Sequence, residues 1–141
     1  MTKEREAVIA EAMTWLRTPY HHMGRVKGAG TDCAMLLAEV FEKVGLLPHL
    51  DIEHYPQDWM LHRDEERYLG WVTRYAIQVF DPKPADIALF RFGRCISHGA
   101  IVVAWPTVIH AFVREGGVCI ADATKGDLKG RGAGFYSFWG K

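Results

Sequence analysis

Residues 30–45 read GTDCAMLLAEVFEKVG and predict the clearest helix in the chain. Thr31 and Asp32 are favourable N-cap residues just before the first turn, and Gly45 is a natural stop after the last. The apolar side chains recur at helical spacing, and the face they form holds Cys33, Leu36, Leu37, Val40, Phe41 and Val44. We therefore expect a helix over residues 33–44 that carries Cys33 in its first turn.

The segments on either side of this helix favour helix and loop. An amphipathic pattern over residues 3–17 predicts a first helix, which ends at Thr18-Pro19 because the residue before a proline avoids the helical region. Residues 20–31 contain three glycines and read as a loop, as do residues 46–60. A further helix is expected over residues 61–80.

Beyond residue 84 the pattern changes to short β-rich runs bounded by glycine or proline. Strands are expected over residues 87–92, 97–105, 107–113, 118–121 and 135–139. Helices first and strands second are typical of an α+β domain. We therefore expect one domain over residues 1–141, with N-terminal helices packed on a small antiparallel β-sheet.

The composition argues against several kinds of partner. Acidic and basic side chains number 17 each and form no basic stripe, so nucleic acid is not an expected partner. The longest apolar run, residues 99–106, is too short to span a membrane, so no membrane partner is expected. The charged start of the chain lacks the apolar stretch of a signal peptide, so we expect synthesis in the cytoplasm.

The chain has three cysteines, Cys33, Cys95 and Cys119. A sparse, odd set argues against a disulfide framework, and the lack of a CxxC pair argues against a structural zinc site. Most cysteines are small packed residues. We interpret Cys95, in a Gly-Arg loop, as structural or incidental and Cys119, inside an apolar strand, as core.

Cys33 differs because it stands where a thiolate is favoured. The free backbone N–H groups and the dipole of a helix make its N-terminus positive. The thiolate is the nucleophilic form of cysteine. Leu36 and Val40 would anchor the same helix in the core, so Cys33 is the candidate nucleophile.

Two histidines in the strand-rich half could serve as the base and as the partner that orients it. His98 opens the run of residues 98–103, and His110 lies in the run of residues 107–113. If these runs form neighbouring strands, alternation lets both imidazoles lie on one face. Polar groups on apolar strands cost stability unless they are partnered, so the two together indicate a shared purpose.

Five short motifs resemble, in order and spacing, the signature of the NlpC/p60 family of cysteine peptidases. They are Thr18-Pro19-Tyr20, Gly30-Thr31-Asp32-Cys33, Pro84-Ala85-Asp86-Ile87, Ser97-His98-Gly99-Ala100-Ile101 and Ile109-His110-Ala111. The resemblance spans roughly residues 15–123. Residues 32–45, 55–68 and 99–110 also resemble the branch of the family encoded in phage tail modules and gene transfer agents.

This resemblance implies a papain-like α+β fold and a Cys-His-His triad. Cys33 would attack the scissile carbonyl, His98 would act as its base, and His110 would orient His98. The implied substrate is the peptidoglycan stem peptide, cut between γ-D-glutamate and diaminopimelate or lysine. No metal and no cofactor are implied. Phage tail proteins are the implied protein partners, with the chain incorporated in a tail or particle.

The resemblance also gives candidate substrate-binding positions, at Tyr20, Asp32, Ala34 and Ser97. The Tyr20 hydroxyl could bind substrate or the oxyanion, and the Cys33 N–H could be another oxyanion donor. Asp32 could be a helix cap, a contact for a substrate amine, or both.

The sequence departs from the family pattern in two places. Ala34 and Met35 stand where a small hydroxyl residue and glycine are common, which bears on the exact substrate. His21 and His22 replace small residues and could rim the cleft or be exposed loop side chains. Two other functions stay open: a tail-assembly module that has lost activity, and an amidase or acyltransferase that uses the same triad.

Overall fold

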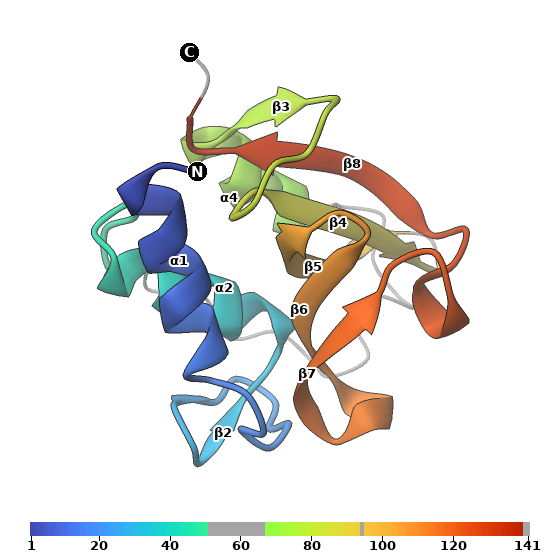
Figure 1. Cartoon of the computed structure of the whole chain (residues 1–141). Coiled ribbons are helices and arrows are strands. Elements are labelled where there is room, and N and C mark those ends of the chain that lie inside the picture. Colours follow the sequence, from blue (N-terminus) through green and yellow to red (C-terminus); the bar gives the residue numbers. More distant parts are fainter. Residues whose placement is uncertain (51–66, 94, 140–141) are drawn as a thin grey trace.

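The computed structural model describes residues 1–50, 67–93 and 95–139. The loop expected at residues 51–60 and the start of the helix expected at residues 61–80 lie outside the described residues. Helices α1 (Lys3–Met13) and α2 (Cys33–Lys43) lie side by side on one side of a twisted β-sheet (Figure 1). The expected α+β class, with N-terminal helices on an antiparallel sheet, is confirmed.

Helix α1 is capped by Thr2, whose hydroxyl accepts a hydrogen bond from the Arg5 N–H at 3.2 Å. The helix ends at Met13, before the end predicted at residue 17. The chain turns away because Arg17 has a φ of 72° and its N–H donates to the Val118 carbonyl at 3.0 Å. The local pattern of apolar residues does not indicate this long-range backbone hydrogen bond, so it could not predict where the helix ends.

Helix α2 confirms the prediction for residues 33–44 to within one residue. Asp32 caps it, since its Oδ1 accepts the Met35 N–H at 2.9 Å. Gly45 follows the helix with a φ of 83°, a left-handed conformation that favours glycine and ends the helix. The helix is anchored by fully buried side chains, which are Met35, Leu36, Leu37, Val40 and Phe41.

Six strands form one sheet in the order β3-β8-β4-β5-β6-β7, and each neighbouring pair is antiparallel. The strands are β3 (Ile77–Val79), β4 (Ile87–Phe92), β5 (Cys95–Ala104), β6 (Thr107–Phe112), β7 (Gly117–Asp122) and β8 (Gly132–Ser137). All five predicted strands are present; β4 has the predicted ends, and the other four have shifted ends. The expected loop position of Cys95 is wrong, because Cys95 begins β5.

The helix predicted over residues 61–80 is wrong at its C-terminal end. Helix α4 covers Arg67–Tyr75, and the chain then enters β3. β3 pairs with β8, where Gln78 lies opposite Tyr136. The sheet edge supplies backbone hydrogen bonds that local spacing cannot indicate, so tertiary pairing overrides the helical pattern.

The connections hold further short elements. The predicted loop at residues 20–31 contains a two-stranded ribbon, β1 (Arg25–Val26) with β2 (Gly30–Thr31). Two 3-10 turns, η1 (Val113–Glu115) and η2 (Gly126–Leu128), lie before and after β7. Asp86 ends a turn as expected, because its Oδ2 accepts the Lys83 N–H at 2.8 Å.

The sheet carries an apolar cluster on each face. Strand alternation in β4 sends Ile87 and Leu89 toward the helices and sends Ala88 and Phe90 to the other face. The outer cluster is completed by Ala100, Val102, Val108, Ala123 and Leu128. Both faces of the central strands are therefore buried.

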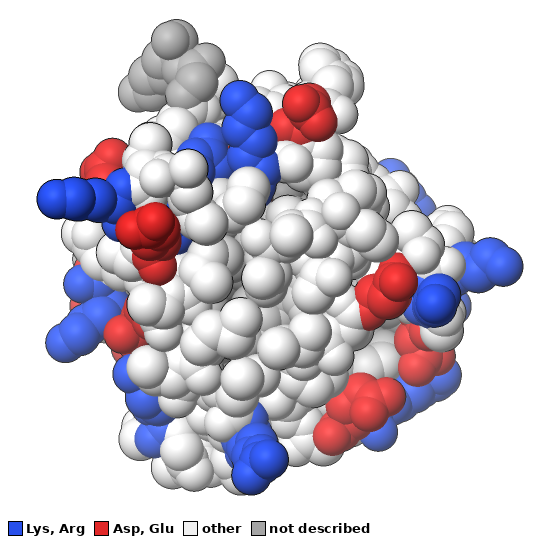
Figure 2. All heavy atoms as spheres, in the orientation of Figure 1, with Lys and Arg blue, Asp and Glu red and all other residues white. Residues whose placement is uncertain are grey.

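Charged side chains of both signs are scattered around a broad uncharged centre on the face shown in Figure 2. This mixture agrees with a formal net charge of zero. Across residues 1–50, 67–93 and 95–139, no helix is long and apolar enough to cross a membrane.

Candidate active site

Cys33 is half buried at the first residue of α2. Its thiol donates toward the carbonyl oxygen of Ser97 on β5, with Sγ 3.9 Å from that oxygen. The N-terminus of the helix therefore meets the sheet one residue before His98. The positive end of the helix dipole lies at this thiol and favours its ionisation.

A β-bulge marks the point where β5 meets Cys33. The strand register pairs Phe90 with His98 and Arg91 with Ile96, which leaves Ser97 as the extra residue. A bulge bends its strand and re-aims the groups beside it. The sequence carried no signal for this bulge, because register depends on the partner strand.

His98 and His110 form a buried pair. His98 Nε2 and His110 Nδ1 are 2.7 Å apart. Only 5% of the surface of His98 and 2% of the surface of His110 are exposed to solvent. The rings meet edge to face at 75°. This contact confirms that both imidazoles lie on one face of neighbouring strands, as the alternation predicted.

Burial also sets the charge of the two imidazoles. It lowers the pKa of His98 well below its ordinary value, and the neighbouring His110 lowers it further. Burial lowers the pKa of His110 to about 4. Both rings are therefore neutral at neutral pH, so one donates and the other accepts the hydrogen bond between them.

Tyr20 lies close enough to Cys33 for their charges to interact. Burial raises the pKa of the Tyr20 hydroxyl above its ordinary value, and Cys33 and Asp32 raise it further. The hydroxyl therefore keeps its proton and remains a hydrogen-bond donor. The backbone holds Tyr20 in place, because its N–H donates to the Gly116 carbonyl at 2.9 Å.

No protein-family model matches the sequence, and no curated protein matches it. Solved structures do match the fold. An NlpC/p60 family protein from Bacillus cereus ATCC 10987 has a TM-score of 0.71 and 19% identity, over 98% of this chain and 41% of that chain. The NlpC/p60 domain of the peptidoglycan hydrolase SagA has a TM-score of 0.60 and 20% identity, over 94% of this chain and 96% of that domain. The peptidoglycan hydrolase RipB from Mycobacterium tuberculosis has a TM-score of 0.64 and 17% identity, over 96% of this chain and 64% of that chain.

The chain has the NlpC/p60 fold. The papain-like architecture that the five motifs implied is therefore confirmed. The chain spans less than half the length of the Bacillus cereus protein but is similar to nearly the whole SagA domain.

Within the NlpC/p60 fold of this chain, Asp32 is more than a helix cap. Its Oδ1 accepts the Met35 N–H, and its Oδ2 accepts the Met23 N–H at 2.7 Å. The residue is only 1% exposed. Asp32 thus fastens the preceding loop onto α2, and a contact with a substrate amine stays a prediction.

The other predicted substrate-binding residues lie near Cys33 along the chain or in space. Ala34 is buried in α2, and Ser97 is buried in the bulge of β5. His22 is half buried, with Nδ1 3.9 Å from Asp32 Oδ2, whereas His21 is exposed. The loop therefore brings His22, rather than His21, toward the residue that precedes Cys33.

Cys119, which we expected in the core, is only half buried. It lies opposite His110 in the register of β6 and β7. Burial and then Glu115 raise the pKa of its thiol. A pocket of about 280 Å³ opens here, and its lining includes His110, Phe112, Glu115, Cys119, Asp122, Lys125 and Asp127. The sequence could not place Cys119 beside His110, because it does not indicate the register of β7 against β6.

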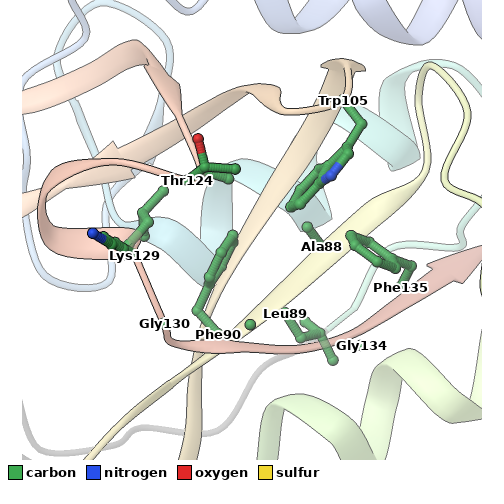
Figure 3. Close-up of a pocket in the computed structure, with 12 residues that line it drawn as sticks. Ala88, Leu89, Phe90, Trp105, Thr124, Lys129, Gly130, Gly134 and Phe135 are labelled. Atoms are coloured by element: carbon green, nitrogen blue, oxygen red, sulfur yellow. The ribbon is translucent and has the colours of Figure 1, made fainter.

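A second pocket, of about 410 Å³, lies on the outer face of the sheet (Figure 3). Trp105 and Phe135 meet edge to face in its lining, with centroids 4.7 Å apart. Phe90 also lines it, and the Phe90 ring centroid lies 5.9 Å from that of His98. Phe90 therefore contacts both this pocket and the histidine pair.

Among the described residues, Glu39, Glu42 and His49 are the group whose ligand atoms lie close enough together to hold a metal ion. Arg25 already pairs with Glu39 at 2.6 Å and approaches Glu42 at 3.9 Å. His49 pairs with Glu42 at 2.8 Å. These contacts explain the cluster as an ion-pair network along α2.

Proposed function

We propose that this chain is a cysteine peptidase that cuts peptidoglycan stem peptides, with Cys33 as nucleophile, His98 as base and His110 as the orienting residue. One observation carries the proposal. Two buried imidazoles are joined at 2.7 Å, next to the bulge whose carbonyl contacts the Cys33 thiol. Covalent acyl transfer needs this order of nucleophile, base and orienting partner.

The proposed role of His98 requires one tautomer of the pair. If His98 Nδ1 is to accept the Cys33 proton, His98 Nε2 must carry the ring proton and donate it to His110 Nδ1, which lies 2.7 Å away. When His98 becomes charged, the His110 acceptor stabilises it. His110 therefore selects both the tautomer and the orientation of the base.

The reaction would proceed in two halves. The Cys33 thiolate attacks the scissile carbonyl carbon, and the electron pair of the carbonyl moves to oxygen, where the Cys33 N–H and the Tyr20 hydroxyl would stabilise it. Collapse breaks the C–N bond, His98 protonates the leaving amine, and a thioester remains. A water that gives its proton to His98 attacks the thioester, which releases the acid and restores the thiol.

The substrate class is supported by the relatives, since SagA and RipB are both named as peptidoglycan hydrolases. Within that class we propose the bond between γ-D-glutamate and diaminopimelate. The resemblance of residues 32–45 and 99–110 to tail-encoded sequences supports delivery to the wall in a phage tail or particle after synthesis in the cytoplasm. Tail proteins would then be the partners.

The deciding experiment is digestion of purified muropeptides by the wild type, Cys33→Ala and the matched control Cys119→Ala, followed by mass spectrometry. We expect the wild type and Cys119→Ala to release the diaminopimelate-containing part, and Cys33→Ala to release none. Cleavage that survives in Cys33→Ala would overturn the assignment of the nucleophile.

Thiol labelling separates the remaining outcomes. If the wild type does not cut muropeptides but Cys33 reacts with iodoacetamide much faster than Cys119 near pH 7, another acyl substrate is indicated. If Cys33 is also unreactive, the chain is a structural module with the NlpC/p60 fold.

A further inference from the structure

Three phenylalanine rings surround the imidazole of His98. The ring centroids of Phe90, Phe92 and Phe112 lie 5.9, 5.6 and 5.4 Å from that of His98. Phe92 and Phe112 present their edges to it, at 79° and 66°. Among these neighbours, only His110 offers a hydrogen-bonding atom to the ring.

Phe112 contacts both members of the pair. Its ring stacks on His110 at 5.2 Å with an interplanar angle of 14°, while it meets His98 edge to face. Phe112 is 8% exposed. The stacked ring fixes the plane of the His110 imidazole, and the edge contact limits rotation of the His98 imidazole. The Phe112 side chain therefore restrains both imidazole rings.

Phe92 supports Phe112 from the side, with centroids 5.9 Å apart. The Arg131 guanidinium lies over the outer face of Phe92 at 4.4 Å from its centroid. Arg131 is itself held, since its Nε donates to the Asp127 carbonyl at 2.9 Å. The arginine therefore anchors the edge of the aromatic cluster that is nearest to solvent.

The side chains of this cluster are apolar and offer the imidazoles no hydrogen-bonding atom. Because an unpaired buried polar group is costly, the hydrogen bond between His98 Nε2 and His110 Nδ1 is strongly favoured in these surroundings. Charged groups line the pocket that also includes His110, and they are Glu115, Asp122, Lys125 and Asp127.

We propose that Phe112, supported by Phe92 and Arg131, is a positioning residue that holds His98 and His110 in the one tautomer and orientation in which His98 Nδ1 faces the thiol. This inference rests on the proposed function of the pair. In this scheme Phe112 acts on the reaction through the two imidazoles that it contacts.

The first test reads the imidazoles directly and needs no activity. Long-range ¹H–¹⁵N spectra of histidine-labelled protein report the tautomer and titration of His98 and His110. We expect one tautomer in the wild type and in Phe135→Leu, a control on the outer face. In Phe112→Leu we expect a second tautomer and a midpoint for His110 raised by about one pH unit as water enters.

The second test reads turnover of muropeptides against pH. Phe112→Leu should lower kcat on the order of tenfold with little change in KM, because substrate binding is untouched. It should also move the acid limb of the profile to higher pH. Phe112→Tyr, which keeps the ring, should restore most of kcat, and Phe135→Leu should match the wild type.

Two outcomes separate the two proposals. An unchanged tautomer and titration in Phe112→Leu would overturn the positioning role, whatever the activity. Altered tautomers in a protein whose wild type never cleaves muropeptides would preserve the positioning role and reject the proposed function. If Phe112→Leu does not fold, Phe92→Leu and Arg131→Ala provide the same readout from the outside of the cluster, with smaller expected shifts.

Discussion

At the scale of single residues, burial keeps the imidazoles of His98 and His110 in the neutral form that a general base needs. A neutral imidazole is the form that accepts a proton, and burial favours the neutral form. The same burial has a cost, because the unfolded chain binds protons to these histidines at a higher pH than the folded chain does. The two histidines should therefore make stability depend on pH.

We predict that the free energy of unfolding is greatest above pH 7 and falls as the pH drops from about 6.5 to about 4. The folded pKa of His110 is about 4 and its ordinary value is 6.5, so protonation favours the unfolded state in this window. Each pH unit inside the window costs about 1.4 kcal/mol for one histidine. Urea denaturation at several pH values measures the slope.

His110→Gln should reduce the slope of stability against pH by about one bound proton, because the residue with the lowered pKa is gone. Equal slopes in the wild type and in His110→Gln would mean that His110 does not titrate between the folded and unfolded states.

At the scale of single elements, α2 depends on Asp32 at two points rather than one. One carboxylate oxygen of Asp32 accepts the Met35 N–H of the helix, and the other accepts the Met23 N–H of the preceding loop. Met23 has a φ of 62°, a conformation uncommon for a residue with a side chain. The bond from Asp32 stabilises that conformation.

We predict that Asp32→Ala lowers the free energy of unfolding by about 2–4 kcal/mol, because it loses a cap and leaves a buried N–H without its acceptor. Thr2→Ala, at the exposed cap of α1, should cost only about 0.5–1 kcal/mol. Asp32→Ser should fall between them, since a hydroxyl can cap the helix but not reach both N–H groups. Denaturant titration of the three variants ranks them, and equal losses for Asp32→Ala and Thr2→Ala would refute the two-point role.

The elements that sequence could predict are those whose signals are local. The cap, apolar face and glycine stop of α2 lie within residues 30–45, and alternation placed His98 and His110 on one face. The bulge at Ser97, the strand β3 and the place of Cys119 beside His110 depend on partners distant in the chain. Local periodicity does not encode such register, so these features became visible only in the fold.

At the scale of the whole molecule, the helical half and the sheet are fastened together along β7. The Arg17 N–H and the Thr18 carbonyl bond to Val118, and the Tyr20 N–H bonds to the Gly116 carbonyl. Residues 17–20 thus lie along the free edge of the sheet like a further strand. The same backbone segment ends at Tyr20, so the joint between the two halves also sets the position of a candidate oxyanion donor.

Gly117 lies at the centre of this joint. It forms a bridge with Pro19, and a Cβ at this position would overlap the Thr18 carbonyl oxygen and lie 3.1 Å from the Pro19 Cα. These neighbours are backbone atoms, so they yield only if the whole segment moves. A side chain at residue 117 must therefore push residues 17–20 away from β7, or push β7 away from them.

We predict that Gly117→Ala lowers the free energy of unfolding by about 1–3 kcal/mol and reduces muropeptide cleavage by moving Tyr20 away from Cys33. Gly132→Ala is the matched control, since a Cβ there meets nothing within 4 Å. Denaturation and turnover of the two variants are the measurements. A Gly117→Ala protein as stable and as active as Gly132→Ala would show that the joint along β7 is loose. A stable but slow Gly117→Ala protein, whose Cys33 still labels at the wild-type rate, would show that the joint acts on catalysis through Tyr20.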